Sequence, residues 1–101
     1  LTTSGPGATN AITGCTAAWM DSIPVLFVSG QSNLHPNTDL RVRGVQMVDI
    51  ISVVRPITKG AFSLQPGLTP MVDDMIRLCL DGRCGPCWLD VTLATQAREE
   101  I

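Results

Sequence analysis

The chain has 101 residues, of which 45% are hydrophobic and 16% charged, and its formal net charge at pH 7 is −2. This composition is typical of a globular domain and excludes a disordered polar chain. The Lys and Arg residues are scattered, so nothing predicts binding to a nucleic acid backbone. The longest apolar run, 23–28, is far shorter than the ~20 residues of a membrane span, so we expect no membrane partner.

The N-terminal residues carry neither an initiating methionine nor the pattern of a signal peptide. Residues 1–5 lack the charged and apolar regions that such a leader needs. Four cysteines in so apolar a chain are fewer than an extracellular disulfide scaffold would use. We therefore expect a cytoplasmic, reducing compartment and a chain that begins within a domain of a larger protein.

The first half of the chain predicts a helix, a buried strand and a loop. Residues 4–7 form a Gly-Pro turn, and small or apolar side chains recur at helical spacing over 8–20. The nearly uniform apolar run that follows predicts a strand over 25–29, buried on both faces of a parallel sheet. Residues 30–39 are polar and contain a proline, which indicates an exposed loop at the C-terminal end of that strand.

The second half repeats the alternation of helix and strand. Apolar spacing indicates a short helix over 45–54, and a short strand is expected over 59–64. Thr69-Pro70 supplies an N-cap and a proline at the first helical position, which predicts a helix as far as about residue 81. The run 87–91 reads as the last strand, followed by a polar tail.

This order of elements predicts an α/β fold. We expect a three-layer arrangement in which a mostly parallel sheet carries helices on both faces, within one domain over residues 1–101 and no second domain. Three strands are few for a parallel sheet, so we expect the chain to be part of a domain.

Five segments stand out because of their composition, order and spacing. They are Thr3–Asn10, Asp21–Gln31, Gly44–Ile50, Arg55–Lys59 and Gly82–Val91. In this order they resemble the N-terminal, pyrimidine-binding domain of thiamine-diphosphate-dependent enzymes of the acetolactate synthase type. The resemblance covers almost the whole chain and implies that it is the C-terminal part of that domain.

The resemblance implies a cofactor site at a subunit interface. In this family the pyrimidine domain faces the diphosphate-binding domain of a partner subunit, and a glutamate upstream of the glycine-rich turn activates the cofactor. That glutamate has no counterpart here, because Glu99 and Glu100 lie at the wrong end of the chain. The Gly-Asp-Gly motif that holds Mg²⁺ and the diphosphate is also absent. We therefore assign no catalytic or metal-binding residue, and we expect the isolated chain to be inactive.

The residues that the resemblance assigns to cofactor binding are Pro6, Gly7, Asn10 and Gln46. Glycine permits close approach of the backbone, and free N–H groups at the start of a helix can bind a polar ligand. Taken without the resemblance, a Gly-Pro-Gly turn is more often a plain connector, and Gln46 would be a solvated helix residue.

For the parent enzyme the resemblance implies decarboxylation of a 2-oxo acid such as pyruvate and transfer of the acyl-carbanion unit to a second 2-oxo acid. This is the acetolactate synthase reaction of branched-chain amino acid biosynthesis. The expected cofactors are thiamine diphosphate, Mg²⁺ and in some members FAD, in a homodimer or homotetramer. Alternatives are another thiamine-diphosphate lyase or decarboxylase, and a non-catalytic dimerisation fragment.

Cys84-Gly85-Pro86-Cys87 suggests a third hypothesis, a dithiol redox protein, since a C-x-x-C pair with Gly-Pro between is the thioredoxin motif. The context argues against it, because the pair follows a helix and leads into a strand, and Trp88 comes after the motif. Where Cys84 stands, the resembled family has proline. Cys15 and Cys79 supply no second close pair, so a zinc site is not expected.

Overall fold

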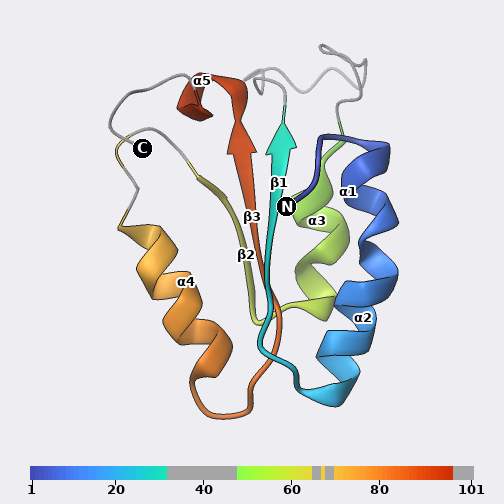
Figure 1. The fold of residues 1–101 in the computed structure, drawn as a ribbon, viewed down its shortest axis with the longest axis vertical. Coiled ribbons are helices and arrows are strands. Elements are labelled where there is room, and N and C mark those ends of the chain that lie inside the picture. Colours follow the sequence, from blue (N-terminus) through green and yellow to red (C-terminus); the bar gives the residue numbers. More distant parts are fainter. Residues whose placement is uncertain (32–47, 65–66, 68–69, 97–101) are drawn as a thin grey trace.

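The computed structural model describes residues 1–31, 48–64, 67 and 70–96. Within this part, helices and strands follow one another in the predicted alternating order (Figure 1). The strands are β1 (Leu26–Gln31), β2 (Gly60–Leu64) and β3 (Cys87–Thr92). The helices are α1 (Pro6–Asn10), α2 (Ile12–Asp21), α3 (Ile50–Val54), α4 (Met71–Leu80) and α5 (Leu93–Gln96), with a 3-10 turn, η1 (Arg55–Ile57), after α3.

The three strands form a parallel sheet in the order β1-β3-β2, so β3 is central. The register pairs both Phe27 and Ala61 with Trp88, which sets these side chains in one row across the sheet. The rings of Phe27 and Trp88 stack with centroids 4.9 Å apart. Every residue of β3 except Val91 is buried, as expected for a strand with neighbours on both edges and cover on both faces.

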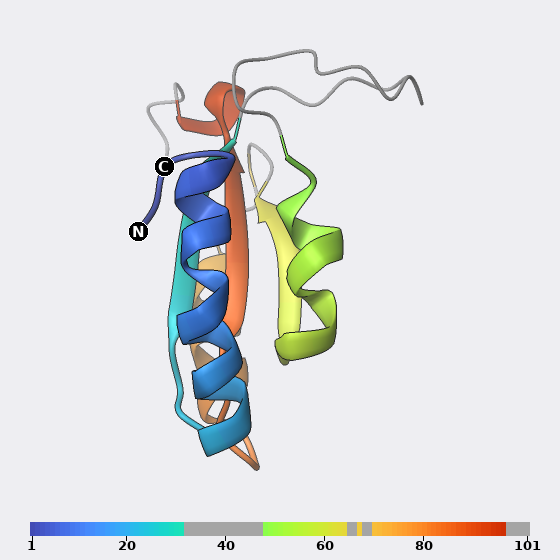
Figure 2. The ribbon, with the colours of Figure 1, turned by 90° about the vertical axis from the view of Figure 1, so that its right-hand side faces the viewer.

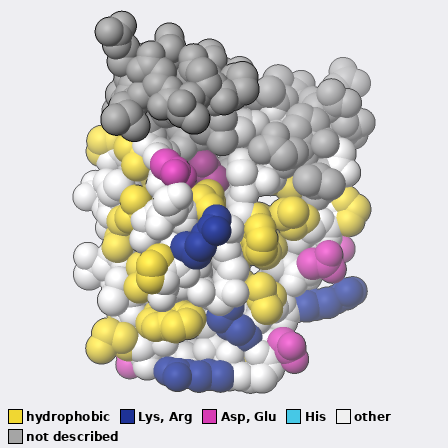
Figure 3. Space-filling view, turned by 180° about the vertical axis from the view of Figure 1, so that it is seen from behind, with side chains coloured by type: hydrophobic (Ala, Val, Ile, Leu, Met, Phe, Trp, Pro, Cys, Tyr) yellow, Lys and Arg dark blue, Asp and Glu magenta, His cyan; other side chains and the backbone are white. Residues whose placement is uncertain are grey.

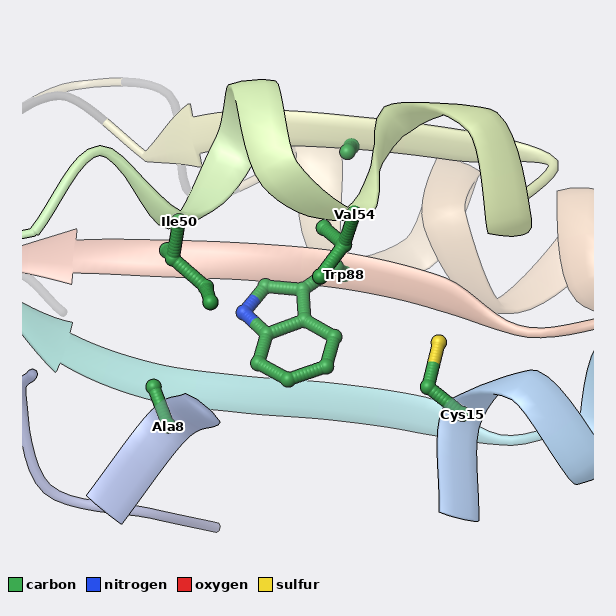
Figure 4. Close-up of a cluster of buried hydrophobic side chains, with 6 residues drawn as sticks. Ala8, Cys15, Ile50, Val54 and Trp88 are labelled. Carbon is green, nitrogen blue, oxygen red and sulfur yellow. The ribbon is translucent and has the colours of Figure 1, made fainter. Parts of the chain in front are cut away.

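Helices cover both faces of this sheet. In two perpendicular views α1, α2 and α3 lie on one side and α4 on the other (Figures 1 and 2). The core beneath the first three helices surrounds the fully buried Trp88 (Figure 4). Its other buried members are Ala8, Cys15, Ile50, Val54 and Ala61. The predicted three-layer α/β fold is therefore confirmed.

Among the described residues, α4 is the helix that covers the other face of the sheet. Met75 and Cys79 are four residues apart, so they share one face of this helix, and they pack against Cys87 and Leu89 of β3. The two aspartates in its first turn are exposed, and their negative charges interact favourably with the helix dipole. The helix is thus divided lengthwise into an apolar side and a charged side.

The helix predicted over 8–20 is divided in two. The N–H of Ala11 bonds to the carbonyl of Ala8, a tighter spacing than that of an α-helix, and this turn separates α1 from α2. The second helix ends at Asp21, and its C-cap residue Ser22 adopts a left-handed conformation with φ of 58°. The prediction was right about a packing helix and wrong about its continuity.

The ends of β1 and β3 also differ from the prediction. Gly30 and Gln31 were assigned to a loop, but both continue β1 in register with Val91 and Thr92. Beyond β3, residues 93–96 form α5 where a polar tail was expected. The buried hydroxyl of Thr95 explains this, because it donates to the carbonyl of Leu64 at 2.9 Å and joins α5 to the end of β2.

The remaining helices begin later than predicted. In the described part α3 starts at Ile50, after an N-cap in which Asp49 accepts a hydrogen bond from the backbone of Ser52 at 3.3 Å. Pro70 occupies the N-cap position of α4 rather than its first helical position, and Thr69 lies outside the described residues. The short strand expected over 59–64 is confirmed as β2.

Candidate functional site

The C-terminal edge of the parallel sheet gathers several segments of the chain (Figure 1). Residues 2–4 lie along β1, where Thr2 donates from its N–H to Val28 at 2.8 Å and accepts from Gly30 at 3.0 Å. The chain then turns into α1 at Gly5. A side chain at Gly30 would lie 3.4 Å from Nε2 of Gln96, so α5 closes the same edge. Ligands of open α/β sheets bind at this kind of edge.

Gly5 and Gly7, at the turn into α1, are favoured over larger residues for two different steric reasons. Gly5 is the N-cap residue of α1 and has φ of 59°, which a residue with a Cβ adopts at a cost. Gly7 has no such dihedral, but a Cβ there would lie 2.5 Å from Cγ2 of Thr3. A side chain at residue 7 would therefore require Thr3 or the first turn of α1 to shift.

Three of the four predicted binding residues lie together on α1. Pro6 and Asn10 are exposed, and Gly7 is half-buried. Gln46, the fourth, lies outside the described residues. The structure therefore brings Pro6, Gly7 and Asn10 to one accessible helix at the C-terminal edge of the sheet.

A buried polar network lies beneath this edge. The hydroxyl of Ser29 donates to Oδ1 of Asp90 at 2.6 Å and accepts from Nε1 of Trp88 at 2.9 Å. The amide Nε2 of Gln31 donates to Oδ2 of Asp90 at 3.2 Å and also to the carbonyl of Val48. Asp90 is 2% exposed. The network therefore joins the ends of β1 and β3 to the residue that precedes the cap of α3.

Burial raises the pKa of the Asp90 carboxyl above its ordinary value. The hydrogen bonds from Ser29 and Gln31 act in the opposite direction, because they favour the charged form, and the nearby Asp49 carboxylate adds to the rise. The carboxylate is thus kept in the interior at an electrostatic cost that its two donors offset in part.

Sequence reasoning missed this network. A charged residue in the otherwise apolar run 87–91 was the available signal, since an aspartate inside a buried strand needs partners. Those partners, Ser29 and Gln31, are about sixty residues away and become neighbours only through the register of β1 with β3.

The opposite edge of the sheet has a different character. Trp19, Lys59, Arg83 and Cys84 line a small hollow there. Arg83 donates through Nε to the hydroxyl of Ser22 at 2.6 Å, and the ammonium of Lys59 donates to the carbonyl of Asp81. These cations stabilise the turns that join helices to strands.

The four cysteines are free thiols. Cys84 is half-buried, whereas Cys87 is fully buried, packs beside Cys79 and has a pKa raised to about 12, chiefly by burial. A dithiol enzyme needs a lowered thiol pKa, so this environment argues against the redox hypothesis.

Within the described residues no group of three or more His, Cys, Asp or Glu side chains is placed to hold a metal ion. No helix there is long and apolar enough to cross a membrane.

Comparison with known proteins agrees with the resemblance. Residues 1–53 match the family described as thiamine pyrophosphate enzyme, N-terminal TPP binding domain. An acetolactate synthase from Arthrospira platensis is 39% identical over 93 residues, which are 90% of this chain and 16% of that protein. The acetolactate synthase isozyme 3 large subunit of Escherichia coli is 37% identical over 93 residues, with the same coverage of both chains.

The chain thus spans about one sixth of the length of these curated relatives. The family match extends over more than half of the chain, including the turn before α1 and the whole of β1. The chain belongs to the thiamine pyrophosphate enzyme family, and its match is to the N-terminal TPP binding domain of that family.

Proposed function

We propose that this chain forms the pyrimidine side of a thiamine diphosphate site in an enzyme of the acetolactate synthase type. The observation that carries the proposal is the 36–39% identity to acetolactate synthases over about nine-tenths of the chain. The parent enzyme would decarboxylate pyruvate and join the acyl unit to a second 2-oxo acid, in branched-chain amino acid biosynthesis. We propose a cytoplasmic location, which the four free thiols of this chain support.

The residues at the C-terminal edge fit the polar ring of this cofactor. Asn10 is exposed and offers both an amide donor and a carbonyl acceptor. Gly7 lets Thr3 pack closely against the start of α1, and Pro6 and Asn10 remain exposed beside this turn. We assign Pro6, Gly7, Asn10 and Gln46 to the cofactor. When bound, thiamine diphosphate supplies the electron sink that decarboxylation of a 2-oxo acid requires.

The other expected cofactors belong to parts of the enzyme beyond this chain. The described residues provide no cluster of carboxylates for Mg²⁺, so we propose that the metal and the diphosphate are bound by another domain. We propose FAD for the parent only by analogy with the resembled enzymes.

A subunit interface is the expected setting of this site, in a homodimer or homotetramer. Large apolar side chains remain exposed, and the face behind that of Figure 1 shows hydrophobic side chains interspersed with Lys and Arg (Figure 3). Met20 is 69% exposed and Leu80 is 58% exposed. Such residues favour contact with further protein in the parent enzyme.

The test is an assay of the full-length parent enzyme with pyruvate, with and without added thiamine diphosphate. We expect release of CO₂ that depends on the cofactor, with acetolactate as the product. Acetaldehyde as the product would instead identify a decarboxylase of the same fold. An enzyme that neither binds thiamine diphosphate nor consumes pyruvate would contradict the proposal and favour a non-catalytic dimerisation role.

Asn10 is tested in the same enzyme by isothermal titration with thiamine diphosphate. Loss of one amide contact in Asn10→Ala is expected to weaken cofactor affinity by up to about tenfold. Thr13→Ala, at another exposed position one turn further along the chain, is the matched control and should leave affinity unchanged. Equal affinity of the Asn10→Ala variant and the wild type would remove Asn10 from the site.

A further inference from the structure

Ala8 is the one residue of α1 that is buried, with an exposed fraction of 1%. A helix of five residues is too short to be stable by itself, so tertiary contacts decide where it lies. Ala8 packs into the core cluster around Trp88, beneath the face of the sheet that α1 covers (Figure 4). The position of α1 on the sheet therefore depends on this cluster, and the exposed residues Pro6 and Asn10 move with the helix.

Trp88 is the largest fully buried side chain among the described residues, and its ring is held in two ways. The indole lies parallel to the ring of Phe27, with an interplanar angle of 8° and centroids 4.9 Å apart. Its Nε1 donates to the hydroxyl of Ser29 at 2.9 Å. Stacking fixes the plane of the indole, and the hydrogen bond fixes its rotation in that plane, because a rotated ring would leave a buried N–H without this acceptor.

The Ser29 hydroxyl can accept from the indole because its own hydrogen is used elsewhere. It donates to Oδ1 of Asp90 at 2.6 Å, and an ionised carboxylate is an acceptor only. The lone pairs of the Ser29 oxygen are then available to the N–H of Trp88. All three residues are buried. Asp90 therefore orients Ser29, and Ser29 orients Trp88.

We propose that Trp88 is a positioning residue for Asn10, with Ser29 and Asp90 holding the indole in place. The indole supports α1 through Ala8, and Asn10 lies on the same short helix, two residues further along the chain. The inference rests on the proposed function, since Asn10 is assigned there to the cofactor. Trp88 is fully buried, so its role requires no contact with the cofactor.

The test uses the full-length parent enzyme at a temperature at which every variant is folded. Trp88→Phe can still stack on Phe27, but it removes the N–H and part of the ring that supports Ala8. Ser29→Ala keeps the indole and removes its acceptor, so it tests the same contact from the other side. Met75→Ala is the matched control, because Met75 is also buried but packs between α4 and β3 on the opposite face of the sheet.

Isothermal titration measures the affinity of each variant for thiamine diphosphate. If Trp88 acts through Asn10, the loss in Trp88→Phe is no larger than that in Asn10→Ala, so we expect affinity to fall by about three- to tenfold. Ser29→Ala should weaken affinity by a smaller factor. Met75→Ala should lower the unfolding temperature and leave affinity unchanged.

Hydrogen exchange reports directly on the position of α1. The N–H of Thr9 bonds to the carbonyl of Gly5, and the N–H of Ala11 bonds to that of Ala8, each at 3.0 Å. Loss of support beneath the helix should speed exchange at both amides in Trp88→Phe. The control Met75→Ala should leave both rates unchanged.

A double-mutant cycle separates positioning from stability. We expect Trp88→Phe to change affinity by less than about twofold when Asn10→Ala is already present, because the residue that it positions is gone. A merely structural role would give the same loss with and without Asn10→Ala. Equal losses in the two backgrounds, or wild-type affinity in Trp88→Phe or Ser29→Ala, would overturn the inference. If the wild-type enzyme itself shows no affinity for thiamine diphosphate, the proposed function fails and this inference fails with it.

Discussion

The hydroxyl of Ser29 donates to Asp90 across the boundary between β1 and β3, at a distance of 2.6 Å and with both residues buried. Ser29 and Asp90 are also partners in the register of β1 with β3, so the hydrogen bond joins two side chains that are direct neighbours in the sheet. The same hydroxyl accepts from the indole of Trp88. The centre of the apolar core is thus joined directly to the polar residues at the C-terminal edge of the sheet.

Replacement of Asp90 by asparagine should change how stability depends on pH. Burial raises the pKa of Asp90, so the folded chain holds the proton more tightly than the unfolded chain does. This contribution to stability is complete below the ordinary Asp pKa of about 3.9 and is lost as pH rises through the higher folded value. The free energy of unfolding of the wild type minus that of Asp90→Asn should therefore fall as pH rises above about 4.

Urea unfolding at a series of pH values measures this difference. Asparagine also loses the hydrogen bond from Gln31. This loss shifts the difference in unfolding free energy by the same amount at every pH, so it does not change the slope of that difference against pH. Asp73→Asn, on the exposed side of α4, corrects for the change in net charge. A difference that is constant or rises over this range would show that Asp90 does not titrate as its burial requires.

Trp88→Phe should separate the stacking of the indole from its hydrogen bond. Phenylalanine can still stack on Phe27, but it removes the Nε1 donor to Ser29 and leaves a space in a fully buried site. We expect a loss of about 1–3 kcal/mol in the free energy of unfolding. Chemical denaturation measures it, and Trp19→Phe, at a partly exposed position, is the control with a smaller expected loss.

The layers of the fold were predictable because they depend on local patterns. The apolar run at 23–28 and the amphipathic spacing before residue 81 each specify one element, and the alternating order then specifies a parallel sheet. The division of the first helix at Ala11 was not predictable, because it depends on a single tightened turn and not on composition. The continuation of β1 through Gly30 and Gln31 depends on a partner strand that is distant in the sequence.

The candidate site was predictable only in part for the same reason. Pro6, Gly7 and Asn10 lie within five consecutive residues, so a sequence resemblance alone brings them together, and the structure places them on one accessible helix. Gln31 and Asp90 form a pair only after folding, through a polar contact that no periodicity encodes. Gln46 lies outside the described residues, and its assignment stays a prediction.

Gly7→Ala tests the steric account of the turn before α1. The new methyl group would lie 2.5 Å from Cγ2 of Thr3, a distance that requires one of the two segments to move. We expect a loss of about 1–3 kcal/mol in the free energy of unfolding, although alanine alone favours a helix. Thr3→Ser removes the clashing methyl group, so the double variant should recover most of the loss. Failure of the double variant to recover would place the strain elsewhere in the turn.

The four cysteines should react at very different rates with an aromatic disulfide such as 5,5′-dithiobis(2-nitrobenzoate). Cys15 is buried and its pKa is raised to about 11, and Cys87 is buried with a pKa raised to about 12, so both thiols are protonated and shielded at pH 8. Cys79 is buried beside Cys87, whereas Cys84 is half-buried at the edge of a surface hollow. We expect one thiol of the native chain to react rapidly and all four to react in urea.

Cys84→Ser should abolish the rapid phase, and Cys15→Ser should leave it unchanged. Rapid loss of two thiols with formation of a Cys84–Cys87 disulfide would restore the redox hypothesis. That result would show that the Cys87 thiol is reactive in spite of its burial.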